Sequence, residues 1–235
     1  MPRKPRHYMA GVPTHILQHA KEGSSVFQSE RDYVYYLSCL QHALLQHDCQ
    51  LHAYMLLPDH VHLVITPNTA SGVSGMMQSL NVRYARYGNR QYQNRGTVWQ
   101  GRYRACLIEA ERYLISLQCF LDQHVVREGI VSSADKYQWS SCRYFIGRTQ
   151  SNILTPHEVF YSLGDTLQER QHVYSALVQN PVTTKIRDHI QTSLRTELPL
   201  GSREFRHHIE SELNVDLGYA TRGRPRKGPP LQIKH

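Results

Sequence analysis

The chain has 235 residues, of which 40% are hydrophobic and 20% are charged, and its formal net charge is +8. It contains no apolar run of 18 or more residues, and no apolar leader follows the basic first residues, so neither a membrane-spanning helix nor a secretory signal is expected. The five cysteines show no paired spacing and predict reduced cytosolic thiols, which argues against a disulfide framework. The positive charge favours a polyanionic partner such as nucleic acid, although a merely basic protein has the same balance.

The first half of the chain predicts alternating strands and helices. A short strand is expected over residues 14–18, and a helix over residues 29–48 has Ser29 as its N-cap. Two strand-like runs, at residues 52–57 and 61–66, are separated by a Pro-Asp pair that suits a tight turn. These two runs predict a β-hairpin.

The pattern continues with a helix over residues 71–91, an extended run over 99–108 and a third helix over 111–127, bounded by Gly129. The order of strand, helix, hairpin, helix, strand and helix predicts an α+β fold, in which helices pack on an antiparallel sheet.

The pattern of the remaining chain predicts helices. Four helices are expected, at residues 155–163, 167–179, 184–194 and 202–214. We therefore divide the chain into an α+β domain, a small all-helical region and a basic flexible tail, with bounds 1–150, 151–218 and 219–235.

Two histidines stand two residues apart in the second strand of the predicted hairpin. Residues two apart on a strand point to the same face, so His60 and His62 are expected to lie side by side, with Val61 and Leu63 turned into the core. Two such imidazoles can bind a divalent metal, but a third ligand must come from elsewhere. The alternative is a pair of exposed histidines on a half-buried strand.

Arginine, tyrosine and amide side chains alternate over residues 83–95, at the end of the second predicted helix. Arginines there could neutralise DNA phosphates, and tyrosines could stack on unpaired bases; a solvated basic helix is the alternative. Arg102 and Arg104 flank the next strand and would extend the same groove. The helix residues that we expect to contact DNA are Arg83, Arg86, Tyr87 and Arg90.

Both ends of the chain are basic and contain proline. The segment from Arg222 to Pro225 is similar to the core of an AT-hook, whose arginines enter an A·T minor groove, although a plain basic tail has the same composition. The N-terminal arm is open to the same two interpretations. The terminal residues that we expect to contact DNA are Arg3, Lys4, Arg6, Arg222, Arg224 and Arg226.

Taken together, these segments resemble the REP-associated tyrosine transposases, which are bacterial members of the HUH single-strand nuclease superfamily. The resemblance covers about residues 1–165, and the helical tail is similar to that of longer members. The segments that carry it are 1–7, 11–13, 52–56, 59–64, 74–80, 99–103, 113–114, 127–131 and 137–141.

The resemblance implies that residues 1–150 form a ferredoxin-like HUH catalytic domain and that the helical region 151–218 binds DNA. It also implies that His60 and His62 hold a divalent metal, Mg²⁺ or Mn²⁺. The metal polarises the scissile phosphate, and a helix tyrosine attacks it to form a covalent 5′-phosphotyrosine on single-stranded DNA. The implied partner is single-stranded or hairpin DNA of REP elements. A cytoplasmic, nucleoid-associated protein is expected, with a monomer favoured over a dimer.

The sequence departs from the family at the nucleophile. The family's third helix carries its tyrosine four residues before an Asn-Pro pair, and Phe120 occupies that position here. Phenylalanine has no hydroxyl, so covalent cleavage should be lost. Two origins are open: a substitution engineered to trap a DNA complex, which the intact metal and binding features favour, or natural loss of cleavage. Tyr113 lies two turns away, about 10 Å along the helix axis, too far to replace it.

His124 stands where the family has the asparagine of that pair. It follows Phe120 by four residues and is expected on the same helix face, where it could reach the metal; a polar residue facing the groove is the alternative. An all-imidazole set would suit Mn²⁺, Co²⁺ or Zn²⁺ better than Mg²⁺.

Two further functions remain open beside DNA transposition. One is a domesticated, non-catalytic DNA-binding or regulatory protein, which would bind DNA without a metal. The other is a metal-dependent phosphodiesterase that uses activated water and forms no protein–DNA adduct.

Overall fold

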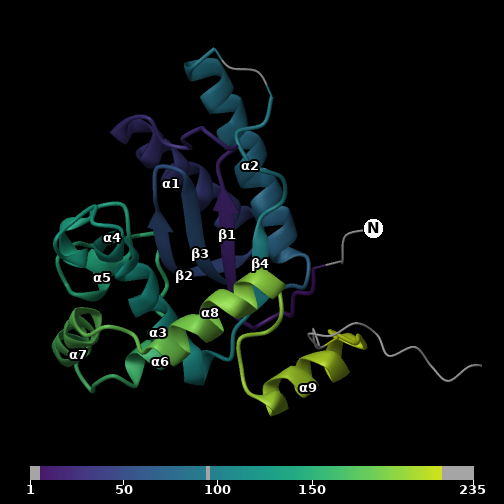
Figure 1. Cartoon of the computed structure of the whole chain (residues 1–235), viewed down its shortest axis with the longest axis vertical. Coiled ribbons are helices and arrows are strands. Elements are labelled where there is room, and N and C mark those ends of the chain that lie inside the picture. The colour runs from purple at the N-terminus through teal and green to yellow at the C-terminus, as the bar shows by residue number, and fades with distance from the viewer. Residues whose placement is uncertain (1–5, 94–95, 219–235) are drawn as a thin grey trace, which may run out of the picture.

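A computed structural model describes residues 6–93 and 96–218 of the chain (Figure 1). The predicted contacts of Arg3, Lys4, Arg222, Arg224 and Arg226 therefore lie outside the described residues.

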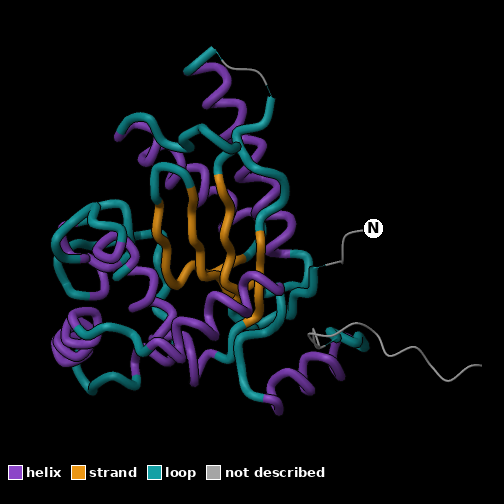
Figure 2. Tube along the Cα trace, viewed as in Figure 1, coloured by secondary structure: helices purple, strands orange, loops and turns teal. Residues whose placement is uncertain are grey.

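Four strands form one antiparallel sheet in the order β2-β3-β1-β4 (Figure 2). With two intervening helices this is the split βαβ arrangement of ferredoxin-like folds, and the predicted α+β class is confirmed. The strands are β1 Thr14–His19, β2 Cys49–Leu56, β3 His60–Pro67 and β4 Arg104–Leu107.

Helices α1 (Glu30–Gln46) and α2 (Gly72–Gln91) cover one face of the sheet and lie behind it in the view of Figure 1. The strands turn alternate side chains toward these helices, so Ile16, Leu63 and Ile65 are fully buried in the core between the layers. The predicted hairpin and both helices are confirmed to within a few residues.

Helix α3 (Ala110–Asp122) packs on the opposite face of the sheet, against β2. The helix predicted over residues 111–127 is not continuous, because it stops at Asp122 and a single turn, α4 (His124–Arg127), follows. The Gln123 amide stands at this break and donates hydrogen bonds to the backbone oxygens of Val178 and Asn180. The long extended run predicted over 99–108 also differs, since only β4 forms a regular strand there.

The rest of the described chain consists of helices and loops: three of the four predicted helices form, whereas the helix predicted over residues 155–163 is a single turn, α6. The last three helices have hydroxyl N-caps. Thr166, Thr183 and Ser202 each accept a hydrogen bond from a backbone N–H in the first turn. None of the described helices is long and apolar enough to cross a membrane. The elements are η1 Ala134–Lys136, α5 Cys142–Phe145, α6 Glu158–Tyr161, α7 Leu167–Gln179, α8 Thr184–Thr196 and α9 Arg203–Leu213.

These C-terminal helices share their cores with the sheet domain. Ile190 of α8 is buried in the cluster that α3 forms with the sheet, and α8 crosses in front of β1 and β4 in Figure 1. Tyr174 of α7 is buried against Phe145 and Phe160 in a third cluster. The division at residue 150 stays a prediction, because the packing is continuous across it.

Short backbone bridges lie along both edges of the sheet. On the β2 edge, Ser140 bridges Met55 and Leu154 bridges Leu51. On the β4 edge, Leu200 pairs with Ile108, and its N–H donates to the Leu107 oxygen at 2.8 Å. Segments from the second half of the chain therefore cover part of each edge of a sheet that the first half builds.

Candidate active site

Three histidines meet at the start of β3. His60 and His62 project from the sheet face opposite α1 and α2, and the break at Gln123 turns His124 of α4 toward them. One ring nitrogen from each histidine can be chosen so that all three lie within 4.8 Å of one another. This is the spacing of a tridentate metal site, and it places both predicted ligands and the candidate third ligand together.

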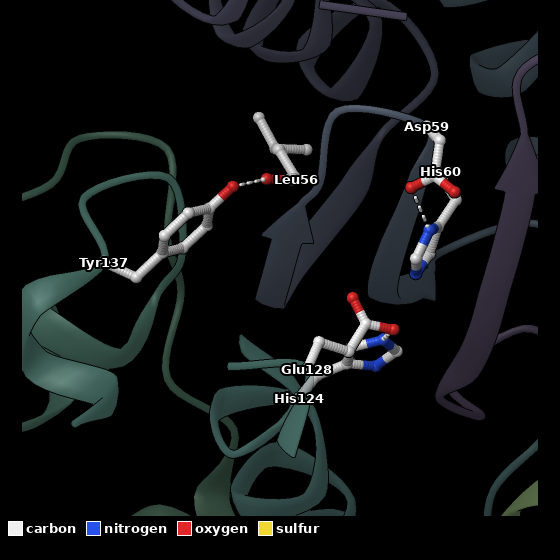
Figure 3. A network of polar contacts seen from close by, with 6 residues as sticks. All are labelled: Leu56, Asp59, His60, His124, Glu128 and Tyr137. Carbon is white, nitrogen blue, oxygen red and sulfur yellow. Dashed lines mark hydrogen bonds and ion pairs between the residues drawn. The ribbon is translucent and has the colours of Figure 1, made fainter. Parts of the chain in front are cut away.

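Each of the three imidazoles is oriented by a hydrogen bond through one ring nitrogen. His60 Nδ1 lies 2.7 Å from Asp59 Oδ1, and His124 Nε2 lies 2.8 Å from Glu128 Oε1 (Figure 3). His62 Nδ1 lies 2.9 Å from Nε2 of the fully buried His15 on β1. Such outer partners fix the ring orientation and tautomer of metal-binding histidines.

The nitrogens that remain are available to a metal ion. His62 Nε2 and His124 Nδ1 are buried atoms without a hydrogen-bond partner among the described residues. Burying a polar nitrogen without a partner is unfavourable. The donor set therefore fits a divalent cation bound by His60 Nε2, His62 Nε2 and His124 Nδ1.

The electrostatic environment keeps the strand histidines neutral. Burial lowers the pKa of His60, and it lowers the pKa of His62 further, together with the charges of His15, His60 and His124. Burial also lowers the pKa of His15 to about 3. Neutral imidazole is the form that binds a metal, so the strand histidines are in their ligand form near neutral pH.

Phe120 lies beside this cluster at the last turn of α3. Its ring is 5% exposed, and its centroid lies 6.5 Å from that of His124. The Arg127 guanidinium packs over the other side of the ring, with its central carbon 4.4 Å from the centroid, and also donates to the Phe120 carbonyl at 3.0 Å. The position next to the three histidines thus carries a side chain that cannot act as a nucleophile.

Comparison with known proteins identifies the segment that carries His60, His62 and Phe120. Residues 9–123 match the family described as "Transposase IS200 like". This part of the chain is similar to IS200-like transposases. This confirms the resemblance to tyrosine transposases at the level of the family. No curated protein matches the chain.

One solved structure supports this fold, and a second is similar over part of the chain. The structure of a REP-associated tyrosine transposase bound to a REP hairpin is similar over 68% of this chain and 93% of that one, with a TM-score of 0.51 and 14% identity. A candidate transposase from Deinococcus radiodurans R1 aligns over 49% of this chain and 94% of that one, with a TM-score of 0.36 and 21% identity. The first likeness confirms that the transposase domain has the expected fold.

The predicted DNA-contacting residues of the transposase domain fall into two places. Arg104 is exposed and pairs across the sheet with Leu17, which in turn pairs with His62, so Arg104 lies on the face that carries the histidines. Arg83, Arg86 and Arg90 lie on α2, in the layer behind the sheet. The structure therefore does not bring the predicted α2 arginines to the metal ligands.

Other predicted residues have structural partners within the chain. Arg6 packs its guanidinium 3.8 Å from the Tyr103 ring centroid, donates to the Tyr103 carbonyl and lies 4.0 Å from Glu197. Tyr87 stacks on Tyr35 at 3.9 Å and donates to Asp32. Arg102 is exposed on the segment before β4. DNA contact by these residues stays a prediction.

Sequence reasoning missed several residues around the site. His15, Asp59 and Glu128 orient the three imidazoles. On the other face of the sheet, Arg31 and Tyr35 of α1 line a groove with the α2 arginines. Asp59 is adjacent to His60, and Glu128 follows His124 by four residues, so local spacing could have indicated both. No local signal marks His15, which reaches His62 only through strand pairing.

Proposed function

We propose that this protein binds single-stranded or hairpin DNA of the REP type, and that residue 120 is the position from which such a domain cleaves and rejoins DNA. The observation that carries the proposal is Phe120 at the end of α3, in ring contact with His124 of the three-histidine cluster. Because phenylalanine lacks the hydroxyl that would attack phosphorus, the chain binds DNA without forming a phosphotyrosine link.

The proposed metal ligands are His60, His62 and His124. A bound divalent cation would supply Lewis-acid polarisation of the scissile phosphate. The family favours Mg²⁺ or Mn²⁺, and three imidazole donors favour Mn²⁺ of these two. Asp59, His15 and Glu128 hold the rings in place, which limits the reorganisation needed when the ion and the DNA phosphate arrive.

The remaining residues of the proposed site bind and orient DNA. Arg104 would hold a phosphate on the face that carries the histidines, and the α2 arginines would neutralise phosphates on the far side of the domain. We further propose that the protein acts as a monomer associated with the nucleoid. The fold of the hairpin-bound REP-associated transposase supports a hairpin DNA partner.

Restoring the hydroxyl tests this proposal. The protein and its Phe120→Tyr variant would each be incubated with Mn²⁺ and a labelled single-stranded REP hairpin, then run on a denaturing protein gel. A labelled covalent band from Phe120→Tyr alone, lost in the double variant Phe120→Tyr with His62→Ala, is the expected result. A band from the unaltered protein would mean that another residue attacks, and would overturn the assignment of position 120.

A non-catalytic DNA-binding or regulatory role is the second candidate. It is favoured by the packing of Phe120, which is nearly buried and covered by the Arg127 guanidinium. Under this alternative, both proteins bind the hairpin tightly with EDTA present, and neither gives a covalent band with Mn²⁺.

A further inference from the structure

A cleft of about 430 Å³ opens next to Phe120, on the side of α3 where the C-terminal helices pack. Helices α4 and α5 form one wall, and α7 with the start of α8 forms the other; α4, α5 and α7 lie near one another in Figure 1. Its volume is within the range of small-ligand sites. The transposase family match ends at residue 123, so most of this cleft is built by residues beyond it.

The charges that line the cleft are unbalanced. Arg148 is neutralised by an ion pair with Asp135. Arg127 and Arg187 also line the cleft, and neither forms an ion pair among the residues that the structure describes. Glu128, the acidic residue next to Arg127 in the chain, is bound to His124.

The two guanidinium groups influence each other. Burial and the positive charge of Arg187 both lower the pKa of the Arg127 guanidinium, and the negative charge of Glu128 opposes them in part. Two arginines that face one space without an ion-pair partner repel each other, and an anion between them would remove the repulsion. A phosphate group fits this arrangement because guanidinium N–H groups match phosphate oxygens in charge and geometry.

The rest of the lining is mixed, and its apolar part gives a ligand a surface beyond the arginines, beside the polar side chains of Gln123, Ser132, Ser133, Ser175 and Gln179. Val126, Val178 and Val182 line the space with Phe120 and Ile146. A base and a sugar can pack on such a surface while the phosphate remains at the arginines. Val126 is 37% exposed, so the cleft is open to solvent at this side and a strand could continue past it.

From this arrangement we infer that the cleft holds one unpaired nucleotide of the bound DNA strand, with its phosphate on Arg127 and Arg187 and its base against the valine wall. The inference rests on the proposed function for the identity of the strand. It assigns the C-terminal helices a direct part in binding, because α7 and α8 supply one wall of the cleft and one of the two arginines. It also places the held nucleotide next to residue 120.

The test compares two charge-matched variants in the full chain. Arg187→Gln removes a cleft arginine, whereas Arg195→Gln removes an arginine two turns along the same helix that does not line the cleft. Binding of fluorescein-labelled dT15 would be followed by anisotropy at several salt concentrations. We expect Arg187→Gln to weaken binding about tenfold and to reduce the salt slope by about one, and Arg195→Gln to change affinity less than about twofold.

A second variant separates the cleft from its charge. Ser175→Phe fills the space from α7 and leaves both arginines in place, so it should weaken dT15 binding as Arg187→Gln does. Thermal unfolding of each variant would confirm that it is folded. If either folded variant binds dT15 as well as Arg195→Gln, the cleft does not hold the strand and the inference is wrong, while DNA binding itself stands.

Titration with 5′-dTMP distinguishes a strand from a free nucleotide. Competition of dTMP with dT15 in the wild-type protein, lost in Arg187→Gln, supports the inference. Binding of dTMP at the cleft with no effect on dT15 would make it a free-nucleotide site and overturn the strand assignment. If wild-type protein binds neither dT15 nor the REP hairpin, the proposed function fails, and absence of dTMP binding then also rejects the cleft as a nucleotide site.

Discussion

Replacing Asp122 by asparagine should stabilise this protein at alkaline pH. Asp122 ends α3 and is 1% exposed, and its Oδ2 accepts a hydrogen bond from the Tyr174 hydroxyl at 2.7 Å. Burial raises the pKa of its carboxyl group from 3.8 to about 7, although hydrogen bonds from Tyr174 and Cys142 act in the opposite direction. The folded protein therefore holds a proton on Asp122 that the unfolded chain has released at neutral pH.

The sign and size of the effect follow from this difference in pKa. Below about pH 4 the carboxyl group is protonated in both the folded and the unfolded protein, so its raised pKa costs no stability. As the pH rises above 4, the free energy of unfolding falls, and it stops falling once the pH passes the folded pKa of about 7. A pKa difference of about three units lowers the free energy of unfolding by about 4 kcal/mol in total, and about 1.5 kcal/mol of this loss has already occurred at pH 5. An asparagine side chain cannot ionise, so the gain from Asp122→Asn should grow by about 3 kcal/mol between pH 5 and pH 8.

Urea unfolding at pH 5 and pH 8, followed by tryptophan fluorescence, measures how the free energy of unfolding gained by Asp122→Asn changes with pH. Buried histidines titrate in both proteins alike, so their contribution cancels in the difference between variant and wild type. Tyr174→Phe is the matched control, because it removes a donor that stabilises the carboxylate and should destabilise the protein more at pH 8 than at pH 5. Equal effects of Asp122→Asn at both pH values would refute the reasoning.

Three further changes have defined outcomes. His15→Gln should weaken Mn²⁺ binding about 10- to 100-fold, measured by calorimetry, because the partner that orients His62 is altered; an unchanged affinity would contradict this role. Joint replacement of Arg86 and Arg90 by glutamine should reduce the salt slope of hairpin binding by about two, and an unaltered slope would show that this face does not bind phosphates. Thr166→Ala should lower the free energy of unfolding by about 1 kcal/mol in urea, because the N-cap of α7 is lost, with no change in metal binding.

Local patterns were sufficient to predict the elements that position the site. Alternation along residues 61–66 placed Val61 and Leu63 in the core and therefore turned His60 and His62 to the opposite face. The start of α1 was also predicted correctly, since Ser29 is its N-cap residue and the Asp32 carboxylate accepts from the Ser29 N–H.

Features that depend on distant segments were not predictable in the same way. The helix break at Gln123 is accompanied by hydrogen bonds to the backbone of residues 178 and 180, which lie 55 and 57 positions along the chain. The contact between His15 and His62 requires the register of β1 against β3. The cleft beside Phe120 depends on how α7 and α8 pack, which periodicity within each helix does not specify.

The covered edges of the sheet bear on how copies of this protein can associate. An exposed edge strand has backbone N–H and C=O groups without partners. These groups can pair with the edge strand of another molecule, which joins the two sheets or leads to aggregation. Here the bridges from Ser140, Leu154 and Leu200 occupy backbone positions along β2 and next to β4. Along β2, a second copy could extend the sheet only after displacing the segments of Ser140 and Leu154, whereas on the other side the bridge from Leu200 occupies only the end of β4. The second half of the chain therefore hinders edge-to-edge self-association mainly at the β2 edge.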